Sequence, residues 1–244
     1  KQAYARDMVR EGQILQVSFP DGKSSYPNTE ENAADICIAY EDDDYYVINK
    51  PAGLATMYSP GQGGVTLESG LYHYLGCPSN YVFRPVNRLD KGTSGLMAAA
   101  KHAHAQQLLQ KELHTERFVR EYTALCKGQL PQREGIICAP IGKMENSIKR
   151  CVNEAGKEAV TEYRVLETGK KATLVRLRLR TGRTHQIRVH MQSIGHPVLG
   201  DVIYGHKHLP RAERLLLHAY SLSFTHPVTK ERMYFEAKCP FAEE

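Results

Sequence analysis

The sequence predicts an α+β fold in which strands outnumber helices. Three pairs of strand-like segments flank short turns, as the two arms of antiparallel hairpins do. A few other stretches repeat apolar residues at helical spacing instead. At 244 residues the chain suits one large domain or two lobes, and either can bury a sizeable core.

The expected strands, in chain order, are residues 36–40, 45–50, 96–100, 117–126, 159–166, 172–180, 221–224 and 232–237. Alternation is clearest in residues 172–180, because Val175, Leu177 and Leu179 face one side and three arginines face the other. Residues 132–157 contain scattered Gly, Pro, Asn and basic residues, so we expect this segment to be irregular.

The expected helices are residues 65–75, 102–114 and 184–193. In the last of them Ile187, Met191 and Ile194 follow the spacing i, i+4, i+7, so all three should be buried. Thr181 or Thr184 is expected to cap its N-terminus, since threonine hydroxyls accept hydrogen bonds from the first free backbone amides of a helix.

Charge is distributed unevenly along the chain. Residues 24–49 contain seven acidic residues and no Lys or Arg, whereas residues 170–218 contain ten Lys or Arg against two acids, a net charge of +8. The formal net charge of the whole chain is only +5. A local concentration of positive charge indicates either a solvated basic face or a surface for a polyanion.

The six cysteines are widely spread and include no Cys-x-x-Cys pair, which argues against a zinc site or a dense disulfide framework. We expect buried, reduced thiols in a cytoplasmic protein. No run approaches the roughly 18 apolar residues of a membrane span, and residues 1–7 contain no apolar region typical of a signal peptide.

The loop before the third expected strand concentrates charge and turn-forming residues. Asp90 lies between the cations Arg88 and Lys91, and residues 92–95 (Gly-Thr-Ser-Gly) favour a tight loop. The spacing alone fits two interpretations. One is a surface turn with an ordinary ion pair; the other is a carboxylate held on a rigid turn at the start of a strand.

Two motifs in this order resemble those of the RluA-type pseudouridine synthases. The first is residues 88–96, Arg-Leu-Asp-Lys-Gly-Thr-Ser-Gly-Leu. The second is residues 181–191, Thr-Gly-Arg-Thr-His-Gln-Ile-Arg-Val-His-Met, followed by Gly195-His196-Pro197 and Gly200-Asp201. The resemblance covers roughly residues 36–240.

The resemblance implies the catalytic fold of that family, a long mixed and mostly antiparallel sheet with flanking helices and a central cleft. It implies a catalytic domain at residues 35–244. Residues 1–34 are then an N-terminal segment and linker, a possible remnant of an S4-like RNA-binding module, with a short strand near residues 11–20.

The resemblance also implies roles for particular residues. Asp90 corresponds to the catalytic nucleophile, Arg188 to its charge partner and Tyr122 to a tyrosine that stacks on the base. The residues expected to contact substrate RNA are Arg88, Lys91, Arg183, His185 and Leu217. Asp90 either attacks C1′ or abstracts a neighbouring ribose proton. The arginine row of residues 172–180 is a solvated face or a ridge that contacts RNA. No metal and no cofactor are expected.

The implied function is isomerisation of specific uridines in structured RNA, 23S ribosomal RNA or transfer RNA, by a cytoplasmic enzyme that is monomeric by default. An alternative is an RNA-binding protein without catalysis, which rests on the same basic segment. A glycoside hydrolase would need two carboxylates. No second acid accompanies Asp90 in its loop, and the acidic residues 41–44 resemble a solvated turn.

Overall fold

The computed structural model describes residues 8, 10–14, 34–59, 64–145, 147, 149–205 and 212–242. Of the strand expected near residues 11–20, residues 11–14 are not in a strand and residues 15–20 lie outside the described residues, as does most of the N-terminal segment at 1–34. The described strands are β1 (Cys37–Glu41), β2 (Tyr45–Lys50), β3 (Ser94–Ala100), β4 (Phe118–Lys127), β5 (Glu134–Cys138), β6 (Ile141–Lys143), β7 (Arg150–Val152), β8 (Val160–Thr168), β9 (Ala172–Leu179), β10 (Leu217–Thr225) and β11 (Arg232–Glu236).

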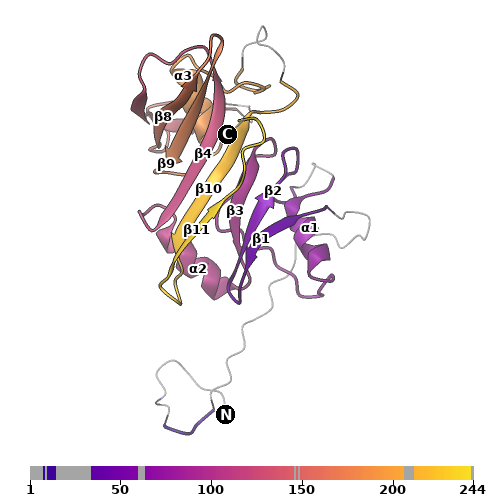
Figure 1. Ribbon diagram of the computed structural model, residues 1–244. Helices are drawn as coiled ribbons and strands as arrows, with labels where there is room; N and C mark the ends of the chain where they lie inside the picture. Colours follow the sequence, from indigo (N-terminus) through magenta and orange to yellow (C-terminus); the bar gives the residue numbers. More distant parts are fainter. Residues whose placement is uncertain are drawn as a thin grey trace.

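A single mixed sheet runs through the molecule (Figure 1). Its nine strands follow the order β1-β2-β3-β10-β4-β9-β8-β5, with β11 paired to β10 outside this path. Among the pairings that the structure describes, β3 and β10 are parallel and the other strands of this sheet are antiparallel. The predicted α+β class and the three predicted hairpins are therefore confirmed.

The parallel pair joins two antiparallel parts of the sheet, and a glycine makes it possible. Gly95 pairs with Ala219 and has φ +107°, a conformation that residues with a Cβ rarely adopt. A Cβ at this position would lie 2.2 Å from the Ala219 carbonyl oxygen. The glycine that follows the Asp90 loop therefore lets the two halves of the sheet meet.

Three helices lie outside the sheet: α1 (Leu67–Tyr74), α2 (Ala103–Glu112) and α3 (Gln186–Ser193). A capping box starts α1, because the side chains of Thr66 and Ser69 each accept a hydrogen bond from the other's backbone amide. His102 caps α2 by accepting from the Ala105 amide, and α2 buries Ala105 and Leu109. None of the described helices is long and apolar enough to cross a membrane.

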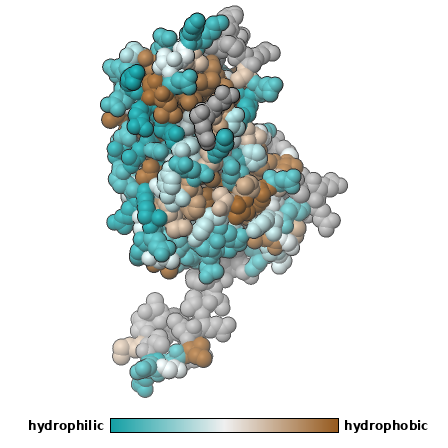
Figure 2. Space-filling view, in the orientation of Figure 1, coloured by the Kyte–Doolittle hydropathy of each residue, from teal (hydrophilic) through white to brown (hydrophobic). Residues whose placement is uncertain are grey.

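Three apolar clusters occupy the interior of the described part of the chain. The first contains Met97, Tyr122 and Leu177 together with two residues of α3, Ile187 and Met191. The second contains Phe118 and Phe224 and packs against α2 and β11. The third is small and includes Val189 of α3. On the face of Figure 2 hydrophilic residues predominate and the hydrophobic residues gather in separate groups, which fits a sheet whose apolar side chains are largely enclosed.

Several local expectations are wrong. Residues 132–157 are not irregular, since they form β5, which extends the main sheet, and the small β6–β7 hairpin. Ile194 is 37% exposed, because α3 ends at Ser193. The cysteines are all free, but only Cys126 and Cys239 are buried.

The arginine row of β9 is paired with acids. Glu116 binds Arg178 and Arg180, and Arg180 also binds Glu162 at 2.7 Å. Arg176 lies 3.8 Å from Glu121 and stacks 3.5 Å above the Tyr220 ring. These pairs neutralise much of the charge that the sequence shows as a basic row.

Gly95→Ala tests the close approach of β3 and β10. We expect it to lower the free energy of unfolding by about 3 kcal/mol or more, because the added Cβ clashes with backbone rather than with a movable side chain. Gly76→Ala is the matched control: Gly76 has φ +73° but open space around it, so strain alone should cost about 1 kcal/mol. Urea unfolding of both variants measures the two costs, and equal costs would contradict the prediction.

Candidate active site

The Asp90 loop is anchored to the rest of the protein through its backbone. The Thr56 hydroxyl donates to the Leu89 carbonyl at 2.7 Å, and the Gly53 amide donates to the Lys91 carbonyl at 2.8 Å. The Thr93 amide closes the turn by donating to the Asp90 carbonyl at 3.0 Å. The side chain of Asp90 is 25% exposed, so the loop presents its carboxylate at the surface of a pocket.

A buried lysine also stabilises the Asp90 loop. Lys50, the last residue of β2, is fully buried, and its Nζ donates to the carbonyls of Pro51 and Leu54 at 2.8 Å and of Lys91 at 3.4 Å. Burial lowers the pKa of Lys50 to about 8, although the charge of Asp90 opposes this shift. The lysine therefore ties the turn after β2 to the loop that carries Asp90.

Arg188 joins Asp90 to a second carboxylate. Its Nε and Nη2 donate to the two oxygens of Asp201 at 2.7 and 2.8 Å, and its Nη1 donates to Asp90 Oδ2 at 3.1 Å. Burial acts to lower the pKa of Arg188, but the two carboxylates outweigh it and the pKa is raised. Asp201 in turn has a lowered pKa, because the guanidinium and two backbone amides overcome its burial. The buried Arg188–Asp201 pair therefore stays charged.

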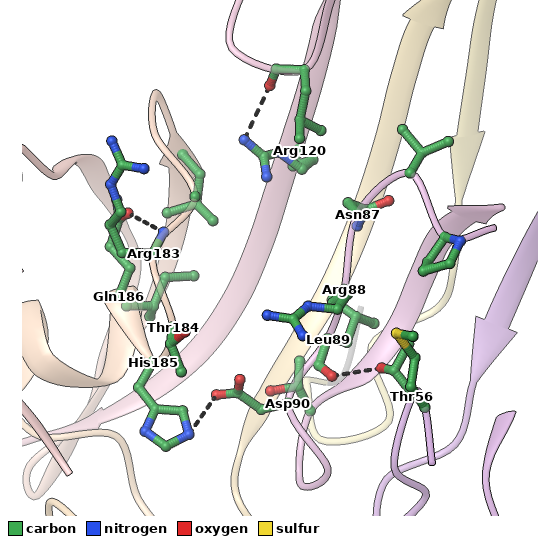
Figure 3. Close-up of a pocket in the computed structure, with 18 of the residues that line it drawn as sticks. Thr56, Asn87, Arg88, Leu89, Asp90, Arg120, Arg183, Thr184, His185 and Gln186 are labelled. Carbon is green, nitrogen blue, oxygen red and sulfur yellow. Dashed lines mark hydrogen bonds and ion pairs between the residues drawn. The ribbon is translucent and has the colours of Figure 1, made fainter. Parts of the chain in front are cut away.

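The start of α3 differs from the expectation. Neither Thr181 nor Thr184 caps it; the N-cap position is His185, whose side chain makes no capping bond and whose φ is +59°. Gln186 closes the turn instead, since its Oε1 accepts from the Arg183 amide and from the Thr181 hydroxyl, both at 2.9 Å. This turn directs His185 toward Asp90 (Figure 3).

His185 lies between Asp90 and a tyrosine. Its Nε2 is 3.8 Å from Asp90 Oδ2, and its Nδ1 hydrogen-bonds the Tyr204 hydroxyl at 2.8 Å. The Arg150 amide also donates to that hydroxyl at 2.8 Å, which ties β7 to the site. Burial lowers the pKa of His185, with Asp90 opposing and Arg188 adding to the shift. The ring is therefore mainly neutral at pH 7.

Tyr122 lies on β4, facing the pocket, and is 5% exposed. Burial and the charge of Asp90 raise its pKa, against the influence of Arg120, so the side chain is a neutral phenol at pH 7. Leu217, at the start of β10, is 3% exposed and lines the same pocket. Tyr122 and Leu217 add apolar surface to a site otherwise rich in charge.

The pocket has a volume of about 760 Å³. The structure brings the following predicted site residues to its wall: Asp90, Tyr122, Arg188, Arg88, Arg183, His185 and Leu217. Lys91 is the exception, because it is exposed and does not line the pocket, although its backbone carbonyl accepts the hydrogen bond from the Gly53 amide. Among the residues that line the pocket, Asp90 is the single acid.

Three residues that the sequence did not single out belong to this arrangement. Asp201 was visible as part of the Gly200-Asp201 motif, but nothing in the motif shows that it holds Arg188. Tyr204 carried no sequence signal, and Arg120 appeared only as one position of an alternating strand. Asp201 bonds Arg188 thirteen residues away and Tyr204 bonds His185 nineteen residues away, and neither separation follows a helical or strand period that a local pattern could reveal.

The sequence profile of the RNA pseudouridylate synthase family matches residues 44–193. The chain is 38% identical over 235 residues to an RNA pseudouridine synthase of Bacillus subtilis (YjbO), covering 96% of this chain and 82% of that protein. It is 44% identical over 222 residues to the ribosomal large subunit pseudouridine synthase D of Vibrio cholerae, covering 83% of this chain and 67% of that protein. The chain therefore belongs to the RNA pseudouridine synthase family.

A solved structure agrees. Human RNA pseudouridylate synthase domain containing 1 superimposes with a TM-score of 0.71 at 28% identity, covering 89% of this chain and 87% of that one. The fold expected from the resemblance is confirmed, and so is the RluA-type family with its activity as an RNA pseudouridine synthase. An RNA-binding protein without catalysis and a glycoside hydrolase are correspondingly disfavoured.

Asp201→Asn tests the buried pair. Removing one partner of a buried ion pair should lower the free energy of unfolding at pH 7 by about 3 kcal/mol. Since the folded-state pKa of Asp201 is depressed, its stabilisation is present above the unfolded pKa of about 3.9 and is lost as pH falls through the folded value. The difference between wild type and variant should therefore shrink below about pH 4. Urea unfolding from pH 7 to pH 3 measures it, with the exposed Asp43→Asn as control; a difference independent of pH would contradict this account.

Proposed function

We propose that this enzyme converts uridines of structured RNA to pseudouridine with Asp90 as its nucleophile, and that 23S ribosomal RNA is its main substrate. The observation that best supports this proposal is the position of the Asp90 carboxylate. Its Oδ2 lies 3.1 Å from Nη1 of the buried Arg188, in a pocket with no other acid in its described lining. The substrate is supported by relatives named ribosomal large subunit pseudouridine synthase D in Vibrio cholerae and Haemophilus influenzae. Transfer RNA is the second candidate.

The reaction needs an ionised, oriented carboxylate. The bond between N1 of uracil and C1′ of ribose breaks, the base turns, C5 bonds to C1′, the proton on C5 leaves and N1 takes up a proton, so that the product is an isomer of the substrate. The Arg188 guanidinium donates a charge-assisted hydrogen bond to Asp90 Oδ2 and so directs that oxygen. The other oxygen, Oδ1, makes no bond to Arg188 and faces the ribose of a bound uridine in our proposal.

Tyr122 and Arg88 complete the proposed site. The buried phenol of Tyr122 offers a rigid ring on which the uracil stacks. Because its pKa is raised, the phenol can take the C5 proton only if it passes its own proton on. Arg88 is exposed, lines the pocket and forms no hydrogen bond with another described residue, so it is available to fill the space left by a flipped uridine or to hold an adjacent phosphate.

We also propose that residues 35–244 act as the catalytic domain of a cytoplasmic monomer, preceded by a remnant of an S4-like module at 1–34. The family match at 44–193 lies inside the proposed domain, and one chain supplies every proposed catalytic residue. Light scattering after size exclusion measures the oligomeric state.

Asp90→Asn should abolish pseudouridine formation, at least a 10³-fold loss of kcat, while RNA binding persists, since an amide is not a nucleophile. The measurement is a pseudouridine map of unmodified ribosomal and transfer RNA by carbodiimide-stop sequencing. Asp43→Asn, an exposed acid of the β1–β2 turn, should act like wild type. Sites made equally by the Asp90 variant would disprove the assignment, and the RNA in which wild-type sites appear names the substrate.

Tyr122→Phe and Tyr122→Leu separate stacking from proton transfer. Phenylalanine keeps the ring, so RNA affinity should change little while the release of tritium from C5-labelled uridine slows at least tenfold. Leucine removes the ring as well, so affinity should also fall. Identical tritium release in wild type and Tyr122→Phe would show that the hydroxyl takes no part.

A further inference from the structure

Arg120 is a buried cation with no carboxylate partner among the described residues. It lies on β4 two residues before Tyr122, on the same side of the strand, and is 6% exposed. Its Nη2 donates to the Leu113 carbonyl at 3.3 Å, its Nε has no hydrogen-bond partner, and its Nη1 forms no hydrogen bond within the described part of the chain. Burial lowers the pKa of Arg120.

Arg188 provides the comparison within the same protein. It is also 6% exposed, yet two carboxylates hold it with three hydrogen bonds. A buried charge without such compensation destabilises the folded state, and arginine stays charged at any physiological pH. The fold alone does not account for Arg120, which suggests that its partner is a ligand.

The surroundings of Arg120 favour an anion. It lines the same pocket as Asp90, and Figure 3 shows the two at opposite ends of the view. A Cβ at Gly182 would lie 3.0 Å from Arg120 Nη1, so the guanidinium reaches the turn that carries Arg183. The same Cβ would lie 3.4 Å from His114 Cε1, and burial lowers the pKa of His114, with the charges of Arg120 and Arg183 adding to that shift.

A second unsatisfied donor lines the pocket. Asn87 is 6% exposed; its Oδ1 accepts from the Ala98 amide at 2.9 Å, but its buried Nδ2 has no partner. Among the described lining residues only Asp90 is acidic, and it is engaged by Arg188. Away from Asp90, the described lining of the pocket therefore offers hydrogen-bond donors and positive charge but no carboxylate that could pair with them.

We propose that Arg120 binds a backbone phosphate of the RNA substrate at the end of the pocket away from Asp90. This inference rests on the proposed function, which supplies a polyanionic ligand. The permanent negative charge of a phosphodiester compensates the buried guanidinium of Arg120, which has no carboxylate partner among the described residues. The phosphodiester oxygens also match the planar set of N–H donors of arginine. Held there, the backbone beside a flipped uridine is fixed relative to the Asp90 carboxylate.

The test uses a stem–loop of unmodified large-subunit ribosomal RNA that is selected by its binding to the Asp90→Asn protein. A neutral methylphosphonate replaces one phosphate linkage of this RNA at a time. The affinity of the Asp90→Asn protein should fall about tenfold when one particular linkage is replaced. In the Asp90→Asn, Arg120→Met double variant, a methylphosphonate at the same linkage should not weaken binding further, because the arginine that pairs with this phosphate is already absent. Asp90→Asn with Arg164→Met, which removes an exposed arginine of β8, should keep the tenfold effect.

Binding to the Asp90→Asn protein does not depend on the reaction, so the test stands even if no pseudouridine forms and the proposed function fails. An equal penalty at every linkage with and without Arg120 would overturn the proposal. Gly182→Ala crowds Nη1 without removing the charge and should weaken the effect of that linkage.

Stability supplies an independent readout. Because Arg120 lacks a compensating acid, Arg120→Met should leave Tm unchanged or raise it, whereas kcat/KM of the enzyme with Asp90 intact should fall at least tenfold. A lower Tm together with an unchanged methylphosphonate pattern would show that Arg120 serves the fold alone.

Discussion

Arg188 and its two carboxylates form the interaction on which the site depends. Asp201, from the turn after α3, holds two nitrogens of the guanidinium, and the third nitrogen reaches Asp90 in the loop before β3. A lone guanidinium next to Asp90 would be free to rotate, and a lone buried carboxylate would tend to take up a proton. Together the three side chains hold the Asp90 carboxylate in a fixed direction at a partly buried position.

The sheet brings these segments together. Asp90 precedes β3, Tyr122 lies on β4 and Leu217 begins β10, and these three strands are neighbours at the middle of the sheet. The parallel contact of β3 with β10 requires Gly95, only five residues after Asp90. One short stretch therefore specifies both the backbone geometry of the sheet and the carboxylate that we propose as the nucleophile, which fits the density of the motif there.

The pocket divides its charges between two tasks. At one end, Arg188 is compensated by two carboxylates and lowers the pKa of Asp201. At the other end, Arg120 has no carboxylate partner within the described part of the chain, which fits a site completed by its substrate. By contrast, the arginine row of residues 172–180 suggested a basic surface in the sequence, but glutamates bind Arg178 and Arg180. A count of positive charges therefore overstates how many of these arginines are available to bind RNA.

The sequence by itself determined the fold class, most strands, the three helices and the family, because alternation, helical spacing and two long motifs are local properties. Only the tertiary structure decided that Asp201 holds Arg188, that Gln186 rather than a threonine closes the turn before α3, and that Lys91 does not line the pocket. It also decided which arginines are paired. These outcomes depend on which side chains the packed fold brings within hydrogen-bond reach and on which of them are buried, and the spacing of residues in a single segment specifies neither.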